Sequence, residues 1–140
     1  MAGGNASDLR APWPHGSNNY VIKLGPCALI ASKTKDFIVE KFQLPFAVKV
    51  KKAYVTAQEV AITNAITLNI VDDSSTPVEI VTDHALAAVT AGAGSYVAMT
   101  VASPNTVLNA GALIEFSYGS GVGDTGTDVA VILLCEPVYA

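Results

Sequence analysis

The stretch AVKVKKAYVTA, residues 47–57, alternates apolar and polar side chains and is interrupted once, by the adjacent lysines at 51–52. Alternation with a period of two predicts a β-strand that has one face in a core and the other in solvent. One extra residue at the two lysines would restore the phase between Val50 and Ala53, which is what a β-bulge does. Without a bulge, the second lysine would point into the core and would need an acidic partner. We therefore predict a bulge at this point.

The remaining sequence repeats this pattern of short strands between turns. Only residues 83–89 come near a helical pattern, with Asp83 as a possible cap of a single turn. Short strands with turns every eight to twelve residues predict an all-β fold, which we take to be an antiparallel β-sandwich of about eight or nine strands. Gly, Pro, Asn, Asp and Ser separate most of the other eight strand-like stretches, which are residues 20–24, 27–31, 36–44, 66–71, 78–81, 95–102, 112–118 and 128–137.

The last of these stretches contains VAVILLC, residues 129–135, which is apolar on both faces. In an antiparallel sandwich, one face of a strand is normally solvated. This strand is therefore either central and covered by a loop or arm, or part of a subunit interface. The second possibility favours a homo-oligomer. Only 14% of all residues are charged, against a typical ~25%, so the chain covers little of its own surface with charge, and this also favours contact with another protein.

Residues 1–19 show neither the period of a strand nor that of a helix, and they are rich in Gly, Asn, Ser and Pro. We predict an extended N-terminal arm over 1–19 and a single β-sandwich domain over 20–140. The only tryptophan, Trp13, lies between two prolines in this arm. An exposed ring would leave apolar surface in water, so Trp13 is expected either to anchor the arm on a partner or to fold back onto its own domain. No secretory signal and no stretch long enough to span a bilayer is visible, so no membrane is expected.

Charge is distributed unevenly along the chain. Residues 1–52 hold all eight basic residues and three acidic ones, whereas residues 53–140 hold nine acidic residues and no basic one. Such a split can mark a nucleic-acid-binding tail, but only Lys49, Lys51 and Lys52 lie close together and no aromatic residues interleave with them, so no nucleic acid is expected. If the two halves interleave in the same sheets, the split serves cross-strand or cross-subunit pairing. One isolated positive face would instead favour a negatively charged partner.

The two cysteines, Cys27 and Cys135, lie near opposite ends of the chain. A disulfide is possible only if their strands are neighbours, and two free buried thiols in a reducing cytosol are the preferred interpretation. Together with His15 and His84 they provide too few ligands at close spacing for a metal site. No metal and no other cofactor is therefore expected.

Two short motifs resemble ligand sites but lack the context that such sites need. GVGDTG, residues 121–126, matches G-x-G-x-x-G, yet a strand pattern follows where a phosphate-binding helix would have to begin. We predict a mobile hairpin loop instead. In DDSSTP, residues 72–77, two adjacent carboxylates would point apart on an extended chain, which indicates a turn and not a calcium site.

No combination of residues indicates catalysis. The two histidines lie in the predicted arm and in a predicted loop, without a nucleophile motif beside them. The glutamates lie mostly at outward or terminal strand positions, so no catalytic residue is predicted and the chain is expected not to be an enzyme. Tyr96, beside AGAG, is the best candidate for an aromatic platform that could bind a sugar. Four other aromatic residues are predicted to lie in the core: Phe37, Phe42, Phe116 and Tyr118.

Four segments together resemble the small jelly-roll structural proteins of tailed bacteriophages, in particular the capsid decoration, or cement, proteins. LPFAVKVKKAYVTA leads into NAITLNIVDDSSTPVEIV, and VLNAGALIEFSYGSG is followed by TDVAVILL. The resemblance covers about residues 36–136 and is one of pattern and not of a diagnostic motif. It implies a jelly-roll sandwich, commonly a homotrimer, that is made in the host cytoplasm and sits on the outer capsid surface of the virion. It also implies that the major capsid protein is the partner, reached by an N-terminal arm.

On these grounds the chain is expected to be a virion structural protein that stabilises a capsid lattice. The residues expected to bind the capsid are those of the arm, namely Arg10, Pro12, Trp13 and Pro14. Two alternatives remain open. The first is a glycan- or receptor-binding module, or the base domain of a head or tail fibre, and the second is a sandwich that degrades polysaccharide.

Overall fold

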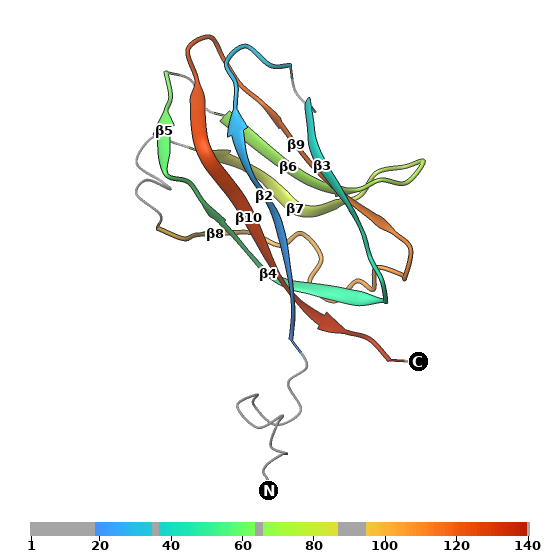
Figure 1. Ribbon diagram of the computed structural model, residues 1–140. Coiled ribbons are helices and arrows are strands. Elements are labelled where there is room, and N and C mark those ends of the chain that lie inside the picture. The colour runs from blue at the N-terminus through green and yellow to red at the C-terminus, as the bar shows by residue number, and fades with distance from the viewer. Residues whose placement is uncertain (1–18, 35–36, 64–65, 87–94, 140) are drawn as a thin grey trace, which may run out of the picture.

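The computed structural model describes residues 19–34, 37–63, 66–86 and 95–139, and these form an all-β sandwich (Figure 1). Within these ranges there is no helix long and apolar enough to cross a membrane. The nine strands are β2 (Tyr20–Leu29), β3 (Phe37–Gln43), β4 (Val48–Thr56), β5 (Glu59–Ala61), β6 (Ile66–Asp72), β7 (Glu79–Leu86), β8 (Val97–Met99), β9 (Leu113–Gly119) and β10 (Thr125–Pro137).

The strands form two antiparallel sheets whose order is that of a jelly roll. The first sheet has the order β2-β10-β4-β8, with β5 pairing with β10, and the second has the order β3-β9-β6-β7. The first strand thus pairs with the last, and the pairs β3/β9, β4/β8 and β6/β7 follow inward along the chain. This is the topology of one long hairpin rolled into two Greek keys, so the jelly-roll sandwich is confirmed.

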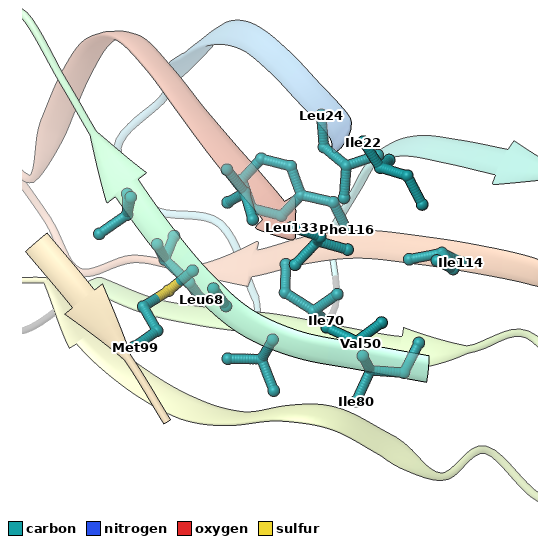
Figure 2. Close-up of a cluster of buried hydrophobic side chains, with 14 of the residues drawn as sticks. Ile22, Leu24, Val50, Leu68, Ile70, Ile80, Met99, Ile114, Phe116 and Leu133 are labelled. Carbon is teal, nitrogen blue, oxygen red and sulfur yellow. The ribbon is translucent and has the colours of Figure 1, made fainter. Parts of the chain in front are cut away.

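The core lies between the inner faces of the two sheets (Figure 2). Alternate residues of each strand point inward, as the period of two requires, and the segment Ile66, Leu68 and Ile70 of β6 is an example. Phe116 and Tyr118 of β9 are the largest fully buried side chains. Both were predicted to lie in the core. Phe37 was predicted there too, but its side chain is 41% exposed, because it lies at the first position of the edge strand β3.

The β-bulge predicted in residues 47–57 is present. Leu134 of β10 lies opposite Lys52, and the next residue, Cys135, lies opposite Val50, so Lys51 is the extra residue of β4. Both lysines are exposed, while the valine is buried. The Lys51 ammonium donates hydrogen bonds at 3.1 Å to the main-chain oxygen of Pro104 and to the side chain of the following residue.

Three strand predictions need correction. The two stretches predicted at 20–24 and 27–31 belong to the single strand β2, which contains a register shift at Gly25 and Pro26 and ends at Leu29. The short strand β5 was missed, because three residues are too few to display a period. The possible helical turn at 83–89 is wrong where the structure describes it. The residues up to Leu86 belong to β7, whose pairing with β6 stabilises an extended conformation that a lone turn cannot match.

Strand β10 explains the stretch that is apolar on both faces. It is central, between β2 and β4, and its inward side chains Val129, Val131, Leu133 and Cys135 are buried. On the outer face, Ala130 is also buried, whereas the next two outward residues, at 132 and 134, are half-buried. Both faces are therefore largely dry, and the outer one keeps apolar surface that another molecule could cover.

Candidate docking surface

The predicted N-terminal arm would join the sandwich at Tyr20, the first residue of β2, which pairs with the end of β10. Tyr20 is opposite Cys135 in this pair, so the start of β2 and the end of β10 lie at the same end of the sandwich (Figure 1). Residues 1–18 lie outside the described residues, so the structure fixes only the point from which the arm starts. The predicted capsid-binding residues all fall in that part: Arg10, Pro12, Trp13 and Pro14.

Exposed apolar side chains gather around this starting point. The rings of Tyr20 and Phe46 meet edge to face, with centroids 4.8 Å apart. The Val138 N–H donates to the main-chain oxygen of Ala47 at 2.9 Å, and this antiparallel contact brings the C-terminal end of the described chain beside Phe46. Three of these side chains are well exposed: Val21 at 53%, Phe46 at 37% and Tyr139 at 74%. We call Tyr20, Val21, Phe46 and Tyr139 the arm-root patch.

The remaining aromatic residues do not form one platform. Phe37 contacts Tyr118 edge to face at 5.6 Å, and the Lys33 ammonium lies 4.4 Å from the centre of the Phe37 ring. Tyr96, the predicted sugar platform, is 65% exposed and directly precedes β8. The two ring pairs among the described residues thus involve other aromatic side chains than Tyr96. A sugar platform usually combines several rings, so the geometry adds little to the glycan alternative.

The GVGDTG segment connects β9 of one sheet to β10 of the other, so the predicted hairpin is wrong because the two strands do not pair. The carboxylate of this segment is a structural anchor. Asp124 is fully buried. Its Oδ1 accepts from the main-chain N–H of Thr63 at 2.7 Å and from the Thr63 hydroxyl at 3.0 Å, and its Oδ2 accepts from the Gly121 N–H at 2.9 Å. The segment joins two strands, as predicted. Asp124 ties it to the β5–β6 connection, which is not what a freely mobile loop would do.

We expect Asp124→Ala to lower the free energy of unfolding by about 2 kcal/mol, because the N–H groups of Thr63 and Gly121 lose a charged acceptor. Asp124→Asn should lose less, since its side-chain oxygen can still accept from Thr63. Urea unfolding followed by tryptophan or tyrosine fluorescence measures both. An alanine variant within about 0.5 kcal/mol of the wild type would contradict the anchoring role.

The predicted turn at residues 72–77 is confirmed. Asp72 Oδ1 accepts from the Val78 N–H at 2.7 Å and from the Ser74 hydroxyl at 3.1 Å, so this carboxylate closes the turn between β6 and β7. Beside the turn is a cavity of about 120 Å³, with Val50, Ile80 and Leu108 among its lining residues. Ligand pockets usually measure about 300–1,000 Å³, so this one is small for a sugar or a nucleotide.

The thiols are free, as predicted, and they are not activated. Cys27 and Cys135 lie on neighbouring strands, but Cys27 is opposite Val129, six positions along β10 from Cys135. Burial raises the pKa of Cys27 to about 11, with a further contribution from the charge of Glu40, and burial raises that of Cys135 to about 12. Both thiols are therefore protonated at neutral pH. Burial also lowers the pKa of His84, which favours its neutral form.

The uneven charge along the chain becomes a difference between the two outer faces. Lys41 of β3 contacts two acidic residues of the second half, with its ammonium 2.8 Å from Asp73 and 3.7 Å from Glu115. This is the cross-strand pairing that the interleaving of the two halves predicts. The lysines on β2 and β4 are arranged differently, and most of them share the outer face of the first sheet.

Comparisons with known proteins identify one similar structure. The sequence matches no known family and no curated protein. Among solved structures, a chain of the cyanophage Pam1 capsid asymmetric unit is similar. The comparison covers 99% of this chain and 100% of that chain, with 18% identical residues and a TM-score of 0.49. Values at this level assign neither a family nor a function to this chain.

Proposed function

We propose that this chain is a non-enzymatic virion structural protein that binds the outer surface of a phage capsid and stabilises its lattice. In this proposal it acts as a homotrimer, and its partner is the major capsid protein. The arm, with Arg10, Pro12, Trp13 and Pro14, makes the principal contact, and the sandwich adds apolar surface around the point where the arm starts.

The observation that best supports this proposal is the arm-root patch. An arm that anchors on a partner brings its own domain against that partner, so the surface around the start of the arm should be adapted to contact. Exposed Phe46 and Tyr139 meet that expectation, because aromatic side chains are enriched at interfaces, and Val21 adds exposed apolar area. The jelly-roll order of the sheets also agrees with the sequence resemblance to decoration proteins, which is an argument by analogy of fold.

The direct test is deletion of residues 1–16, with attachment measured to expanded, undecorated heads of the phage that encodes this chain. We expect the affinity to fall at least about 30-fold, because losing an anchoring tryptophan alone removes about 2 kcal/mol or more. Trp13→Ala should account for much of this loss, and Asn5→Ala, in the same arm, serves as the matched control. Undiminished attachment of the deletion variant would contradict the role of the arm.

The same deletion distinguishes the two roles predicted for Trp13, which are to anchor the arm on a partner or to fold back onto its own domain. If Trp13 packs on its own domain, removing residues 1–16 should lower the free energy of unfolding by the amount expected for a buried aromatic, about 3 kcal/mol. If it anchors on a partner, the isolated protein should keep its stability to within about 0.5 kcal/mol.

The glycan- or receptor-binding module is the second candidate, and exposed Tyr96 is the observation that favours it. A glycan array would identify a ligand, and Tyr96→Ala should then abolish the signal. Loss of head attachment in the same variant, without any glycan signal, would count against this alternative. Polysaccharide turnover that disappears on replacing a single glutamate would support the third possibility.

A further inference from the structure

The outer face of the β2-β10-β4-β8 sheet combines an apolar stripe with lysines. One row across the sheet contains Val21, Leu134 and Lys52, which the strand registers place side by side. We call this surface the basic face. The row above it runs from β2 to β8 and contains Lys23, Ile132, Tyr54 and Ala98.

The lysines of the basic face outnumber its acidic residues. Lys23 and Lys52 are exposed, and Lys51 extends from the bulge at the edge of the sheet. In the next row of the same face, Lys49 lies opposite Glu136, which is an acidic residue. Among the described residues, this end of the outer face therefore carries four lysines and one carboxylate.

The outer face of the β3-β9-β6-β7 sheet has the opposite charge. Lys41 is its single lysine among the described residues and is held by two carboxylates. Glu79 lies opposite outward-facing Val71. On the same face, Asp83 accepts a hydrogen bond from the side chain of Asn69. The first sheet is thus positive at the end where the described chain begins, with Glu59 and Asp128 exposed at its other end, whereas the outer face of the second sheet is negative.

The basic face also has the anatomy of an interface. Ile132 and Leu134 are half-buried at its centre, and the lysines surround them, as polar rims surround apolar centres in protein interfaces. At the β4–β8 edge the face opens into a pocket of about 340 Å³, whose lining includes Lys52, Tyr54 and Ala98. The rows from Ile132 to Glu136 are about 20 Å wide and 15 Å long, which gives about 300 Å² per partner from strand spacing and rise. The arm and the arm-root patch would supply the rest of the ~800 Å² of a standard interface.

We propose that the basic face binds an acidic protein surface, and that the sandwich thereby lies on its partner with the β2-β10-β4-β8 sheet inward and the acidic sheet outward. The inference rests on the proposed function, for which it names the chemistry of the capsid surface. The face is continuous with the arm-root patch, since Val21 belongs to both and Tyr20 is its neighbour in β2. Arm and face therefore reach the same partner together.

Two other occupants fit the geometry less well. A second copy could bring its acidic sheet to the basic face, but contacts through opposite sides of one sandwich repeat without closing and build open stacks. Nucleic acid is favoured by lysines, but a duplex would contact them through its phosphates alone and single strands bind through exposed aromatic platforms. The centre of this face is aliphatic, and Tyr54 is half-buried. An acidic protein surface uses both the apolar stripe and the lysines.

The test compares two double variants that change the net charge equally. Lys23→Gln with Lys52→Gln removes two positive charges from the basic face, and Thr82→Glu with Ala85→Glu adds two negative charges to exposed positions of the other sheet. The full-length chain is titrated onto expanded, undecorated heads at 50 and 300 mM NaCl. We expect the lysine variant to bind about tenfold more weakly at low salt and to lose about half of the salt dependence, because two of the four lysines are removed and rim charges act through screened attraction. The glutamate variant should stay within about twofold of the wild type.

Each other result overturns the inference in a distinguishable way. If the wild type binds heads and both variants bind equally well, the basic face is not the contact, while the proposed function stands. If the wild type fails to bind heads, the proposed function and the inference fall together. Tighter binding of the wild type to a random 30-base-pair DNA duplex than to heads would make nucleic acid the partner. A change in the solution mass of the lysine variant would make the face a contact between copies.

Discussion

Phe116→Ala should lower the free energy of unfolding by about 4 kcal/mol, within the 3–5 kcal/mol range of buried phenylalanine truncations. The Phe116 side chain is fully buried in the middle of β9, between the two sheets (Figure 2). Its removal leaves a cavity that the neighbouring strands cannot close, because their spacing is held by ladders on both sides of β9. Domains are stable by about 5–15 kcal/mol in total, so this one truncation should remove roughly a quarter to four fifths of the stability of the fold.

Urea unfolding measures this effect, and two further variants make it specific. Phe116→Leu should lose much less, since most of the volume remains. Val122→Ala removes a side chain that is 79% exposed and should change stability by less than about 0.5 kcal/mol. If Phe116→Ala lost no more than Val122→Ala, the two sheets would not be packed on one another through this residue.

Gly25→Ala should lower the free energy of unfolding by about 3 kcal/mol. Gly25 has a φ of +90°, which L side chains rarely adopt, and an added Cβ would lie 2.6 Å from the main-chain oxygen of Val129. That oxygen belongs to the central strand β10, so it cannot move aside without breaking the ladder. The left-handed backbone accounts for roughly 1–2 kcal/mol, and the overlap adds about the same amount again. The Gly25 N–H also donates to Glu40 Oε1 at 2.7 Å, a bond that the displaced backbone would lose.

Gly111→Ala separates these two contributions. Gly111 has nearly the same backbone conformation, with a φ of +85°, but nothing lies within 4 Å of an added Cβ. It should therefore lose only the backbone part, roughly 1–2 kcal/mol. Equal losses in the two variants would show that β2 and β10 relax around the added methyl group, contrary to the close approach at Gly25.

Much of the fold can be predicted from local sequence, because a strand with one buried face displays a period of two. The stretch at residues 47–57 shows that even a single-residue irregularity of a strand can be predicted in this way. The slip in phase at 51–52 correctly placed a bulge at Lys51, since only an extra residue keeps Val50 and Ala53 on the same side. The same reasoning failed for β5, which is too short, and for residues 83–86, where the local pattern also fits a turn of helix.

The candidate docking surface could be predicted only in part. The arm, with its tryptophan between two prolines, is predicted from composition alone, and this segment lies outside the described residues. The arm-root patch could not be foreseen, because Tyr20, Phe46 and Tyr139 come from three distant parts of the chain. Asp124 gave no sign of its role either, since its partner Thr63 is 61 positions away.

The sequence by itself determined the all-β class, the inward side of most strands and the separation of basic from acidic residues along the chain. These properties depend on residues near one another in sequence, through the alternation of side chains and the run of charges. Only the tertiary structure decided that the first strand pairs with the last, and that Lys23 and Lys52 therefore share one face while Lys41 is neutralised on the other. The physical reason is that strand order and register are set by packing between distant segments, which no local period records.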